Sequence, residues 1–498
     1  MPHQSTATAA TSLLTSVQRY RHEAVFQRAV LRTIETHLTV ESSGCQAGAV
    51  GGERHALDSE IVPLKARELG PAAIVETIER SGLRGRGGAG FPTGRKWASI
   101  LAGGPEVGDR YAVGNGAEGE PGTFKDRMLM RRNPYQVVEG LAIAAATVDA
   151  VGVYLAVKAS FEPEIEALTR ALSEMSEAGL VGDVPITLVT GPEEYLFGEE
   201  KALLEVIEGE DPLPRLFPPY IYGLFTAMPQ MGWSAGVDLS SDGVAVPSSN
   251  PTLVNNVETL ANVVPILGRG ADWYRSLGTA ESPGVAIATV VGDVQHAGVA
   301  EVELGVPLED VIELVAGGPR PGRTIKAVLS GVASGVIPAR ALDVPVSYEG
   351  LAAIDSGLGS LGFIVYDDTA DMVAVARTVS RFLYVESCGQ CPACKFGTGE
   401  VTAYLDNIAA GEGSDRDVEV IGARLETVTD ANRCFLGAQE QALIGSLLRE
   451  FPEEFAAHLE GAPPAPEVPI AKLVDIRDGV AIYDERQARK RPDWTYAE

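Results

Sequence analysis

Apolar residues in the first half of the chain change their spacing repeatedly, from the three-to-four-residue interval of helices to the continuous runs of buried strands. The expected elements follow in the order helix 71–82, strand 110–115, helix 135–148, strand 151–157, helix 163–179, strand 184–190 and helix 199–208. Such alternation is typical of an α/β domain on a largely parallel sheet. We therefore predict a domain of this class over residues 61–275.

The remaining segments have different patterns. Residues 212–251 are rich in Pro, Gly and Ser and predict a long surface loop, whereas 284–368 alternates short apolar runs with glycines. We expect the latter to form a small β-rich α+β domain with one helix at 307–315. The flanking segments are predicted as a polar N-terminal extension 1–60 with a helix at 20–38, a helical domain 371–460 and a C-terminal tail 461–498.

Composition narrows the class of protein. The chain has 498 residues, of which 45% are hydrophobic, and a net charge of −28, which argues against a nucleic-acid binder. The longest apolar run, 141–157, contains Asp149 and predicts a core helix followed by a strand rather than a membrane span. The N-terminus lacks a secretory pattern, and five cysteines do not suggest a disulfide framework. We therefore expect a cytoplasmic protein.

Cysteine spacing is the strongest local signal. Cys388, Cys391 and Cys394 recur at three-residue intervals, and Cys434 follows much later in "NRCFLGAQEQ". Three thiolates at this spacing suit one iron–sulfur cubane with a distant fourth ligand. Structural zinc usually uses two separated cysteine pairs, so zinc remains the weaker alternative.

Glycines and cations are concentrated in residues 81–97, "SGLRGRGGAGFPTGRKW". The backbone of Gly85, Gly87 and Gly88 can approach a phosphate closely, and Lys96 can supply positive charge. A helix rather than a strand leads into this loop, so it is not a classical dinucleotide fingerprint. A tight turn between two elements is the alternative.

Amide and acidic side chains follow expected strand ends or begin helices. They are Asn115, Glu118, Glu120, Glu199, Glu200, Asn255 and Asn256. Amides can hydrogen-bond a heteroaromatic ring edge, and carboxylates can bind ribose or amide groups. Each glutamate alone is equally explained by a solvated turn or by a favourable position at a helix start.

Five segments occur in the order found in a known family. They are "LRGRGGAGFPTGRKW", "NGAEGEPGTFKDR", "YLFGEEKALLEVIEG", "LVNNVETLANV" and "ESCGQCPACKFGT". The chain resembles the NADH-binding flavoprotein subunit of respiratory complex I, a module shared with diaphorase subunits of NAD-coupled hydrogenases and formate dehydrogenases. The resemblance implies a non-classical Rossmann-like α/β domain that binds FMN and NAD(H), a β-grasp domain and a helical bundle with a [4Fe-4S] cluster.

The resemblance also implies roles for individual residues. Those that match the FMN shell are Gly85, Arg86, Gly87, Gly88, Lys96, Asn115, Glu118, Tyr195, Gly198, Glu199, Asn255 and Asn256. Those that match nicotinamide-nucleotide contacts are Phe91, Glu120, Glu200 and Tyr220, and the four cysteines match the cluster ligands. The implied partners are a [2Fe-2S] thioredoxin-like subunit and further iron–sulfur subunits, through which the chain would lie at the inner face of a membrane.

Some positions depart from the family pattern. Ala117 replaces a usual aspartate, Ser99 a usual aromatic residue and Phe217 a usual basic residue, while Tyr220 stands for a usual phenylalanine. The expected function is hydride exchange between NADH and FMN, followed by single-electron transfer through the cluster. Ser99, Phe217 and the segment 221–249, which looks longer than in the family, favour an alternative: an electron-relay or scaffold subunit that keeps the fold and cluster but has lost NADH binding. A zinc-stabilised nucleotide-binding regulator is a third hypothesis.

Overall fold

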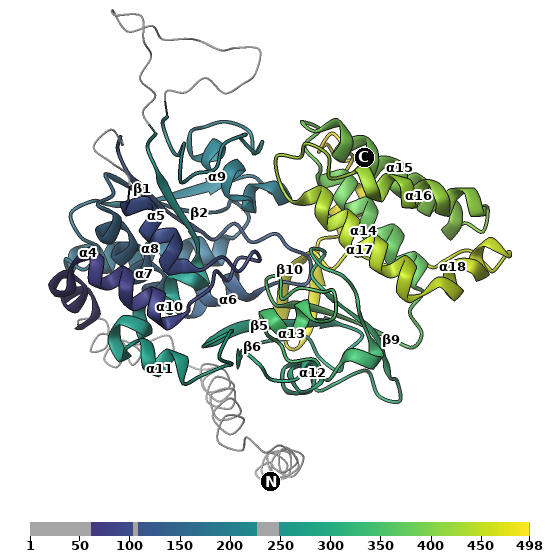
Figure 1. The fold of residues 1–498 in the computed structure, drawn as a ribbon, viewed down its shortest axis with the longest axis horizontal. Coiled ribbons are helices and arrows are strands. Elements are labelled where there is room, and N and C mark those ends of the chain that lie inside the picture. The colour runs from purple at the N-terminus through teal and green to yellow at the C-terminus, as the bar shows by residue number, and fades with distance from the viewer. Residues whose placement is uncertain (1–60, 103–107, 227–248, 498) are drawn as a thin grey trace, which may run out of the picture.

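The computed structural model describes residues 61–102, 108–226 and 249–497 (Figure 1). The helix expected at 20–38 lies outside the described residues. So does most of the loop expected at 212–251, whose described flanks contain turns and irregular backbone.

A four-stranded parallel sheet forms the centre of the first part of the chain. Its strands are β1 (Tyr111–Asn115), β2 (Gly152–Lys158), β3 (Ile186–Gly191) and β4 (Thr252–Asn256). They lie in the order β3-β2-β1-β4, with every neighbouring pair parallel. The prediction of an α/β fold on a parallel sheet is confirmed, although β4 was not foreseen as a strand.

Helices cover this sheet. They are α4 (Ile61–Ser81), α5 (Thr93–Leu101), α6 (Lys125–Arg132), α7 (Pro134–Val148), α8 (Glu162–Glu177), α9 (Glu200–Ile207), α10 (Val257–Arg269) and α11 (Ala271–Arg275). α7 and α10 pack closely because Gly140 has no side chain: a Cβ there would lie 2.1 Å from the Leu260 carbonyl oxygen. The helix expected at 71–82 forms the second part of α4, which is kinked at Gly70.

A second, mixed sheet follows. Its strands are β5 (Val285–Gly292), β6 (Gly298–Glu303), β7 (Ile325–Ser330), β8 (Ile337–Pro338) and β9 (Gly362–Asp367), in the order β6-β5-β9-β7-β8. β5 and β9 are parallel, and the other neighbouring pairs are antiparallel. α12 (Leu308–Ala316) packs on this sheet close to its predicted position, and α13 (Tyr348–Ala352) precedes β9.

Five helices follow the second sheet. They are α14 (Met372–Glu386), α15 (Pro392–Ala409), α16 (Asp415–Thr427), α17 (Leu436–Glu450) and α18 (Pro452–Leu459). They gather at one end of the molecule, opposite the parallel sheet and its helices (Figure 1). The helical pattern that begins at residue 371 in the sequence is therefore present in the structure.

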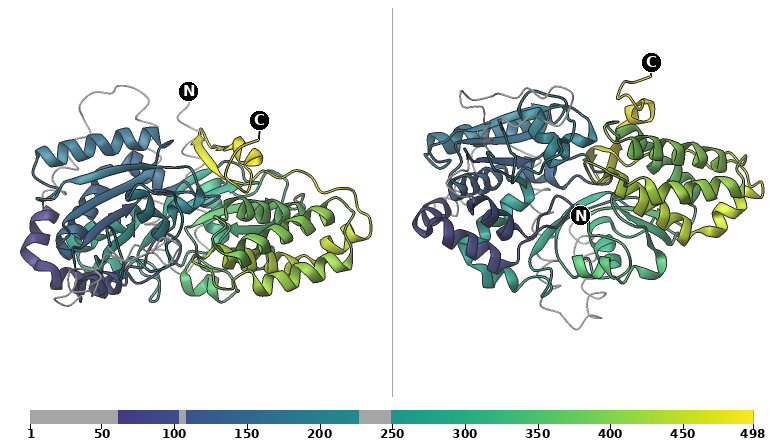
Figure 2. Two further views of the ribbon diagram at one scale, coloured as in Figure 1. Left: turned by 90° about the horizontal axis from the view of Figure 1, so that it is seen from above. Right: turned by 45° about the horizontal axis from the view of Figure 1, so that its top comes forward.

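The C-terminal segment is ordered and joins the parts of the molecule. It contains β10 (Leu473–Arg477), β11 (Val480–Tyr483) and a short 3₁₀ helix, Glu485–Arg489. Asp475 pairs with Arg131 of α6 at 2.8 Å, and the Gly479 carbonyl accepts from Ala297 beside β6. Figure 2 shows this segment (yellow) at the junction between the sheets and the helical end.

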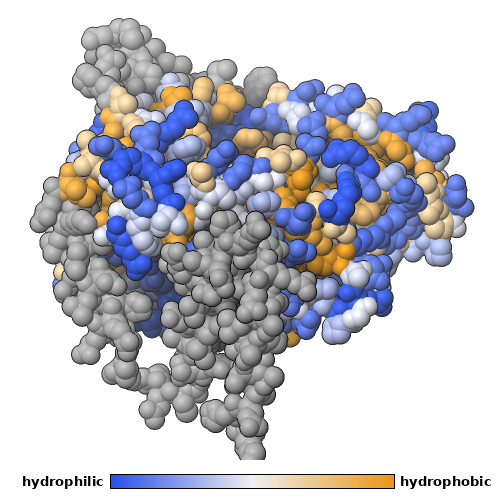
Figure 3. Space-filling view, turned by 60° about the horizontal axis from the view of Figure 1, so that its bottom comes forward, coloured by the Kyte–Doolittle hydropathy of each residue, from blue (hydrophilic) through white to orange (hydrophobic). Residues whose placement is uncertain are grey.

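The surface agrees with the acidic composition. Hydrophilic residues cover most of the coloured surface on the face in Figure 3, with apolar areas between them. Within the described residues, no helix combines the length and the apolar character needed to cross a membrane.

The C-terminal segment ends in a buried ion pair that gives a stability prediction. Lys490 Nζ lies 3.0 Å from both carboxylate oxygens of Glu386, and both side chains are fully buried. Burial alone would raise the pKa of Glu386, but Lys490 and Lys472 hold that pKa below its ordinary value.

We expect Lys490→Met to lower the free energy of unfolding by about 3 kcal/mol, because it leaves a buried carboxylate without its main partner. Arg489→Met is the matched control, since Arg489 is exposed on the same segment. Urea denaturation followed by circular dichroism measures both variants. Equal midpoints for the two variants would contradict the role given to the pair.

Candidate functional site

The carboxyl ends of β1 and β4 bring the predicted amide side chains together. Asn115 and Asn256 are register partners in these parallel strands, and Asn255 lies one residue earlier. Asn115 Nδ2 donates to the Gly198 carbonyl at 2.8 Å, while the Trp97 indole donates to Asn255 Oδ1 at 2.8 Å. Ligands of open α/β sheets bind outside this edge, so the position suits a cofactor crevice.

The glycine loop between α4 and α5 lies against the same edge. A Cβ on Gly87 would meet Asn256 Cβ at 3.1 Å, and Gly88 has a φ of +122°. Within the described residues, no acceptor is bound by the backbone N–H groups of Gly87, Gly88 or Ala89. Unpartnered N–H groups beside a lysine form an anion-binding concavity. The loop therefore fits the phosphate end of a flavin nucleotide.

Arg86 links the glycine loop to the second sheet. Its guanidinium is buried and donates to Tyr274 Oη and the Val285 carbonyl, each at 3.0 Å, and to Tyr348 Oη at 3.2 Å. These contacts tie the loop to the second sheet. Its backbone N–H donates to Thr259 Oγ1 at 2.8 Å. Arg86 therefore positions the glycine loop through its side chain, and its place in the FMN shell remains a prediction.

Lys96, in contrast, remains beside the crevice. Its Nζ lies 2.7 Å from Glu200 Oε2, in the first turn of α9. The neighbouring Glu199 caps the same helix by accepting from the N–H groups of Lys201 and Ala202. Burial raises the pKa of Glu199 to about 7. The start of α9 thus collects two acids next to the cation of the glycine loop.

Glu118 has a structural partner. Its carboxylate accepts from the Asp126 N–H and from Arg127 Nε, both at 3.0 Å. These bonds hold the loop after β1 onto α6. They show that the Glu118 side chain is engaged within the protein, which a solvated acidic turn would not require.

A buried charge network supports Asn256, and its other members have no role that was predicted from the sequence. Asn256 Nδ2 donates to Asp126 Oδ2 at 2.7 Å, and Lys125 pairs with Asp126 at 2.7 Å and with Glu258 at 2.9 Å. Burial raises the pKa of Asp126 to about 7. Lys125 and Asp126 lie in the family segment "NGAEGEPGTFKDR", but only the fold reveals that Glu258 joins them.

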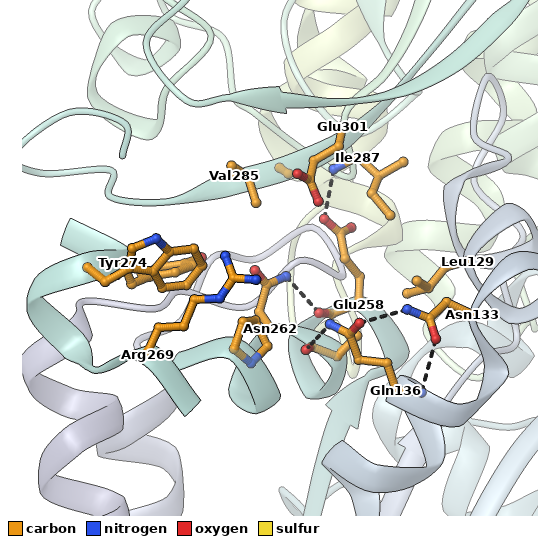
Figure 4. Close-up of a pocket in the computed structure, with 14 residues that line it drawn as sticks. Leu129, Asn133, Gln136, Glu258, Asn262, Arg269, Tyr274, Val285, Ile287 and Glu301 are labelled. Atoms are coloured by element: carbon orange, nitrogen blue, oxygen red, sulfur yellow. Dashed lines mark hydrogen bonds between the residues drawn. The ribbon is translucent and has the colours of Figure 1, made fainter. Parts of the chain in front are cut away.

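A cavity of about 310 Å³ lies on the other side of this network, between α7, α10 and the second sheet. Figure 4 shows Glu258 pointing from α10 toward Ile287, whose N–H donates to it at 2.8 Å. Gln136 and Asn262 also line this cavity. Glu258 therefore separates the cavity from the amide pair at the strand ends.

Glu120 and Tyr195 form a network between the crevice and the helical end. Tyr195 Oη donates to Glu120 Oε2 at 2.5 Å and accepts from Gln439 Nε2 at 2.7 Å. The other Glu120 oxygen accepts from the Val332 N–H at 2.6 Å. Burial raises the pKa of both Glu120 and Tyr195. This network joins the loop after β1 to the second sheet and to α17.

The four predicted cysteines surround one small cavity, which Leu196 and Ser387 also line. Ser387 Oγ lies 3.4 Å from Cys394 Sγ, and the Arg433 N–H donates to Cys391 Sγ at 3.3 Å. Donors of this kind are usual around cluster sulfurs. The distant Cys434 is thus brought to the triplet, as predicted.

The pKa values and the spacing of the four thiols indicate how they would bind a metal and which kind of metal site they fit. Burial raises the pKa of Cys394 to about 11 and that of Cys434 to about 12, so metal binding would release protons. Three cysteines at three-residue intervals with a distant fourth around one cavity fit an iron–sulfur cluster better than a zinc site built from two separated cysteine pairs.

The predicted aromatic contacts divide into two groups. Phe91 is 52% exposed beside the glycine loop, where its carbonyl accepts from the Gly85 N–H, so its ring is free for stacking. Tyr220 is also exposed but follows Pro219, whose carbonyl binds the Thr252 N–H at the opposite end of β4. The structure places Phe91 beside the glycine loop and Tyr220 near the opposite end of β4.

Comparison with known proteins agrees with this geometry. Residues 78–265 match the Nuo51 FMN-binding domain, and residues 374–458 match the NADH-ubiquinone oxidoreductase-F iron-sulfur binding region. The chain is 37% identical over 406 residues to the NADH-quinone oxidoreductase F subunit 2 of Rhizobium meliloti, covering 79% of this chain and 90% of that protein. This chain belongs to the family of F-type subunits of NADH-quinone oxidoreductase.

Other relatives extend the comparison. NADP-reducing hydrogenase subunit HndC of Solidesulfovibrio fructosivorans is 35% identical, over 80% of this chain and 78% of its own length. A solved NAD⁺-reducing [NiFe]-hydrogenase in the H₂-reduced state matches with a TM-score of 0.68 at 34% identity and 80% coverage of this chain. This chain spans 64% of the length of that hydrogenase chain.

The family assignment confirms the predicted cofactors. The FMN-binding match contains the glycine loop and both strand-end amide sites, and the iron–sulfur match contains all four cysteines. The chain is therefore an FMN- and [4Fe-4S]-binding oxidoreductase subunit. The roles of single residues remain predictions that the contacts above refine.

The close approach of Gly87 to Asn256 predicts that a side chain at position 87 weakens the binding of FMN. Gly87→Ala would push Asn256 aside, and we expect FMN to bind about tenfold more weakly, the ratio that ~1.4 kcal/mol produces. Gly422→Ala on α16 is the control, since nothing lies within 4 Å of the added methyl group. Fluorescence titration of deflavinated protein with FMN measures both. Unchanged affinity in Gly87→Ala would remove the loop from the flavin site.

Proposed function

We propose that this chain exchanges hydride between NADH and FMN and passes single electrons through its [4Fe-4S] cluster to a partner subunit. Bound FMN would supply the conversion between two-electron and one-electron chemistry, and the protein would supply binding, orientation and electrostatics. The glycine loop and Lys96 hold the phosphate end, and the strand-end amides face the ring system. Cys388, Cys391, Cys394 and Cys434 hold the cluster.

The observation that carries this proposal is the position of α9. Glu200 contacts Lys96 of the glycine loop, and the adjacent Lys201 donates to the carbonyl of Arg433, the residue before Cys434. Two consecutive residues therefore touch the flavin loop and the cysteine loop. Such proximity is what electron transfer between two bound redox groups needs.

We infer the finer domain organisation from the same arrangement. The second sheet, within 284–368, has the mixed topology expected of a β-grasp domain, and 371–460 is the cluster-bearing bundle. The boundaries 61–275 and 461–498 follow the flavin domain and the C-terminal segment, with 1–60 as an extension.

The nucleotide site is inferred to lie over the flavin, next to Phe91. Glu120 and Glu200 are the candidate contacts, and both are acids that would repel the extra phosphate of NADPH. Glu120 would have to leave Tyr195 or Val332 for a nucleotide group, because both bind it in this structure. NADH is therefore the expected substrate.

The electron exit is inferred to lie beside the cysteines. Phe435 directly follows Cys434 and is 78% exposed, and Phe396 lies two residues after Cys394 and is 72% exposed. Exposed aromatic rings are typical of protein interfaces. They support a docking site for an electron-accepting partner, which the family resemblance suggests is the [2Fe-2S] thioredoxin-like protein together with further iron–sulfur subunits.

A relay subunit without NADH binding is the second candidate. Ser99 donates to the Lys96 carbonyl and offers no ring for stacking, and Phe217 packs on Tyr222 with ring centroids 4.9 Å apart. The engagement of Glu120 by Tyr195 also favours this candidate. Hydride transfer from NADH distinguishes the two.

Anaerobic titration of the purified FMN-loaded protein with NADH provides that test. We expect NADH to bleach the flavin absorbance, and NADPH to do so at least about tenfold less efficiently, because of the repulsion between its extra phosphate and the two acids. Dithionite is the control that shows a reducible flavin. A flavin that dithionite reduces and excess NADH does not would replace the enzyme with the relay.

The two redox centres should be separable by mutation. Cys434→Ser removes a cluster ligand and leaves the glycine loop, Asn115 and Asn255 intact, so we expect FMN binding and reduction by NADH to persist. Electron delivery to a one-electron acceptor protein should fall by at least about 100-fold, while acceptors that react at the flavin keep most of their rate. Gly87→Ala is the reciprocal variant, with weakened flavin and a normal cluster spectrum. An intact cluster in Cys434→Ser would reject Cys434 as a ligand.

A further inference from the structure

A buried carboxyl group on α17 has no part in the site described above. Glu440 is fully buried, and its Oε2 has no hydrogen-bond partner. No lysine, arginine or histidine forms an ion pair with it in the part of the chain that the structure describes. An unpaired carboxylate in such surroundings is strongly disfavoured relative to the neutral acid. Burial accordingly raises the pKa of Glu440 to about 8.

The hydroxyl groups around Glu440 give independent evidence for its proton. Ser380 Oγ lies 2.6 Å from Glu440 Oε1 and 2.9 Å from Thr402 Oγ1, which lies 2.8 Å from the Thr398 carbonyl oxygen. These three contacts need three hydrogens, and the two hydroxyl groups supply only two. The carboxyl group supplies the third if Glu440 donates to Ser380, Ser380 to Thr402, and Thr402 to Thr398.

This row of hydrogen bonds ends on the helix that begins at the cysteine triplet. Thr398 lies one turn after Cys394, and its hydroxyl donates to the Cys394 carbonyl at 2.8 Å. Burial is the main cause of the raised pKa of Cys394, and the charge of Glu440 raises it further. A negative charge on Glu440 would therefore be felt at the cluster, although Glu440 hydrogen-bonds to none of the four cysteines.

Several charged groups on the surrounding helices are engaged elsewhere. On α14, Arg377 pairs with Glu467, and Arg381 donates to the carbonyls of Ala488 and Lys490. On α15, Lys395 donates to three carbonyls, and Glu400 pairs with Arg424 of α16. His458 of α18 pairs with Asp371, and Arg449 of α17 itself approaches Glu450. The Cys394 thiol is the titratable group on a facing helix that senses Glu440.

We propose that Glu440 is a neutral carboxylic acid in the working protein and sets the electron affinity of the cluster held by Cys394 and its three partners. This inference rests on the proposed function, because it requires a cluster at these cysteines. Loss of the proton would place a negative charge in a medium of low dielectric constant and make the cluster harder to reduce. Between the pKa of Glu440 beside the oxidised cluster and its higher pKa beside the reduced cluster, an electron that enters the cluster is then accompanied by a proton that Glu440 takes from solvent.

The test is a redox titration of the cluster in the purified FMN-loaded protein between pH 7 and 10, followed by electron paramagnetic resonance. We expect a constant midpoint potential up to about pH 8 and a progressive fall above it, because the Glu440 proton is lost there. Glu440→Gln is neutral at every pH and keeps a donor toward Ser380, so it should retain the wild-type potential at pH 7 and show no fall. Glu426→Gln removes an exposed acid from α16 and should keep the fall.

A pH-independent potential in the wild-type protein, or an undiminished fall in Glu440→Gln, would overturn the proposal.

Infrared spectroscopy separates this inference from the proposed function. Other carboxyl groups with a raised pKa, such as Asp126 and Glu199, contribute equally to both proteins. The difference between the wild-type and Glu440→Gln spectra at pH 7 should therefore contain the carbonyl band of one protonated carboxyl group, whether or not iron is bound. Zinc in place of iron and labile sulfide would reject the cluster while leaving this difference band in place. Absence of the difference band would reject the neutral acid.

Discussion

The buried pair of Glu386 and Lys490 is the interaction on which the arrangement of the parts depends. Glu386 ends α14, Lys490 belongs to the C-terminal segment, and the second Glu386 oxygen also accepts from the Tyr195 N–H beside the flavin crevice at 3.1 Å. One carboxylate therefore fixes the helical end, the C-terminal segment and the loop before α9. Charge in a low-dielectric interior demands such close pairing, because an unpaired member costs several kcal/mol.

The same constraint shapes the interior around the crevice. Glu118 and Glu258 are buried and each is held by a cation, Arg127 and Lys125 respectively. Glu440 is the exception among these carboxyl groups, since a proton rather than a cation neutralises it. A buried carboxyl group in this protein is therefore either an anion paired with a cation or a neutral acid. The neutral acid can exchange its proton with solvent when an electron enters or leaves the nearby cluster.

Sequence predicted the features that depend on local spacing and missed those that depend on distant partners. The cysteine triplet, the glycine loop and the alternation of helices and strands are each contained in short segments. β4 was missed because three residues, Thr252 to Val254, are too short a run to reveal a strand before two asparagines. The contacts of the Arg86 guanidinium could not be predicted, because Tyr274 and Tyr348, which hold it, lie far along the chain. No local pattern could identify Glu440 as neutral, since that depends on hydroxyl groups of two other helices.

The C-terminal segment has a consequence for biosynthesis. Ribosomes make a chain from its N-terminus, and earlier domains fold while later ones are still being added. The sheets and the cysteine helices can therefore form before Lys490 leaves the exit tunnel, when Glu386 still lacks its cation. The pair that joins α14 to the C-terminal segment can therefore form only after residue 490 has been made. A chain truncated before residue 490 keeps the Glu386 carboxylate without its main cation.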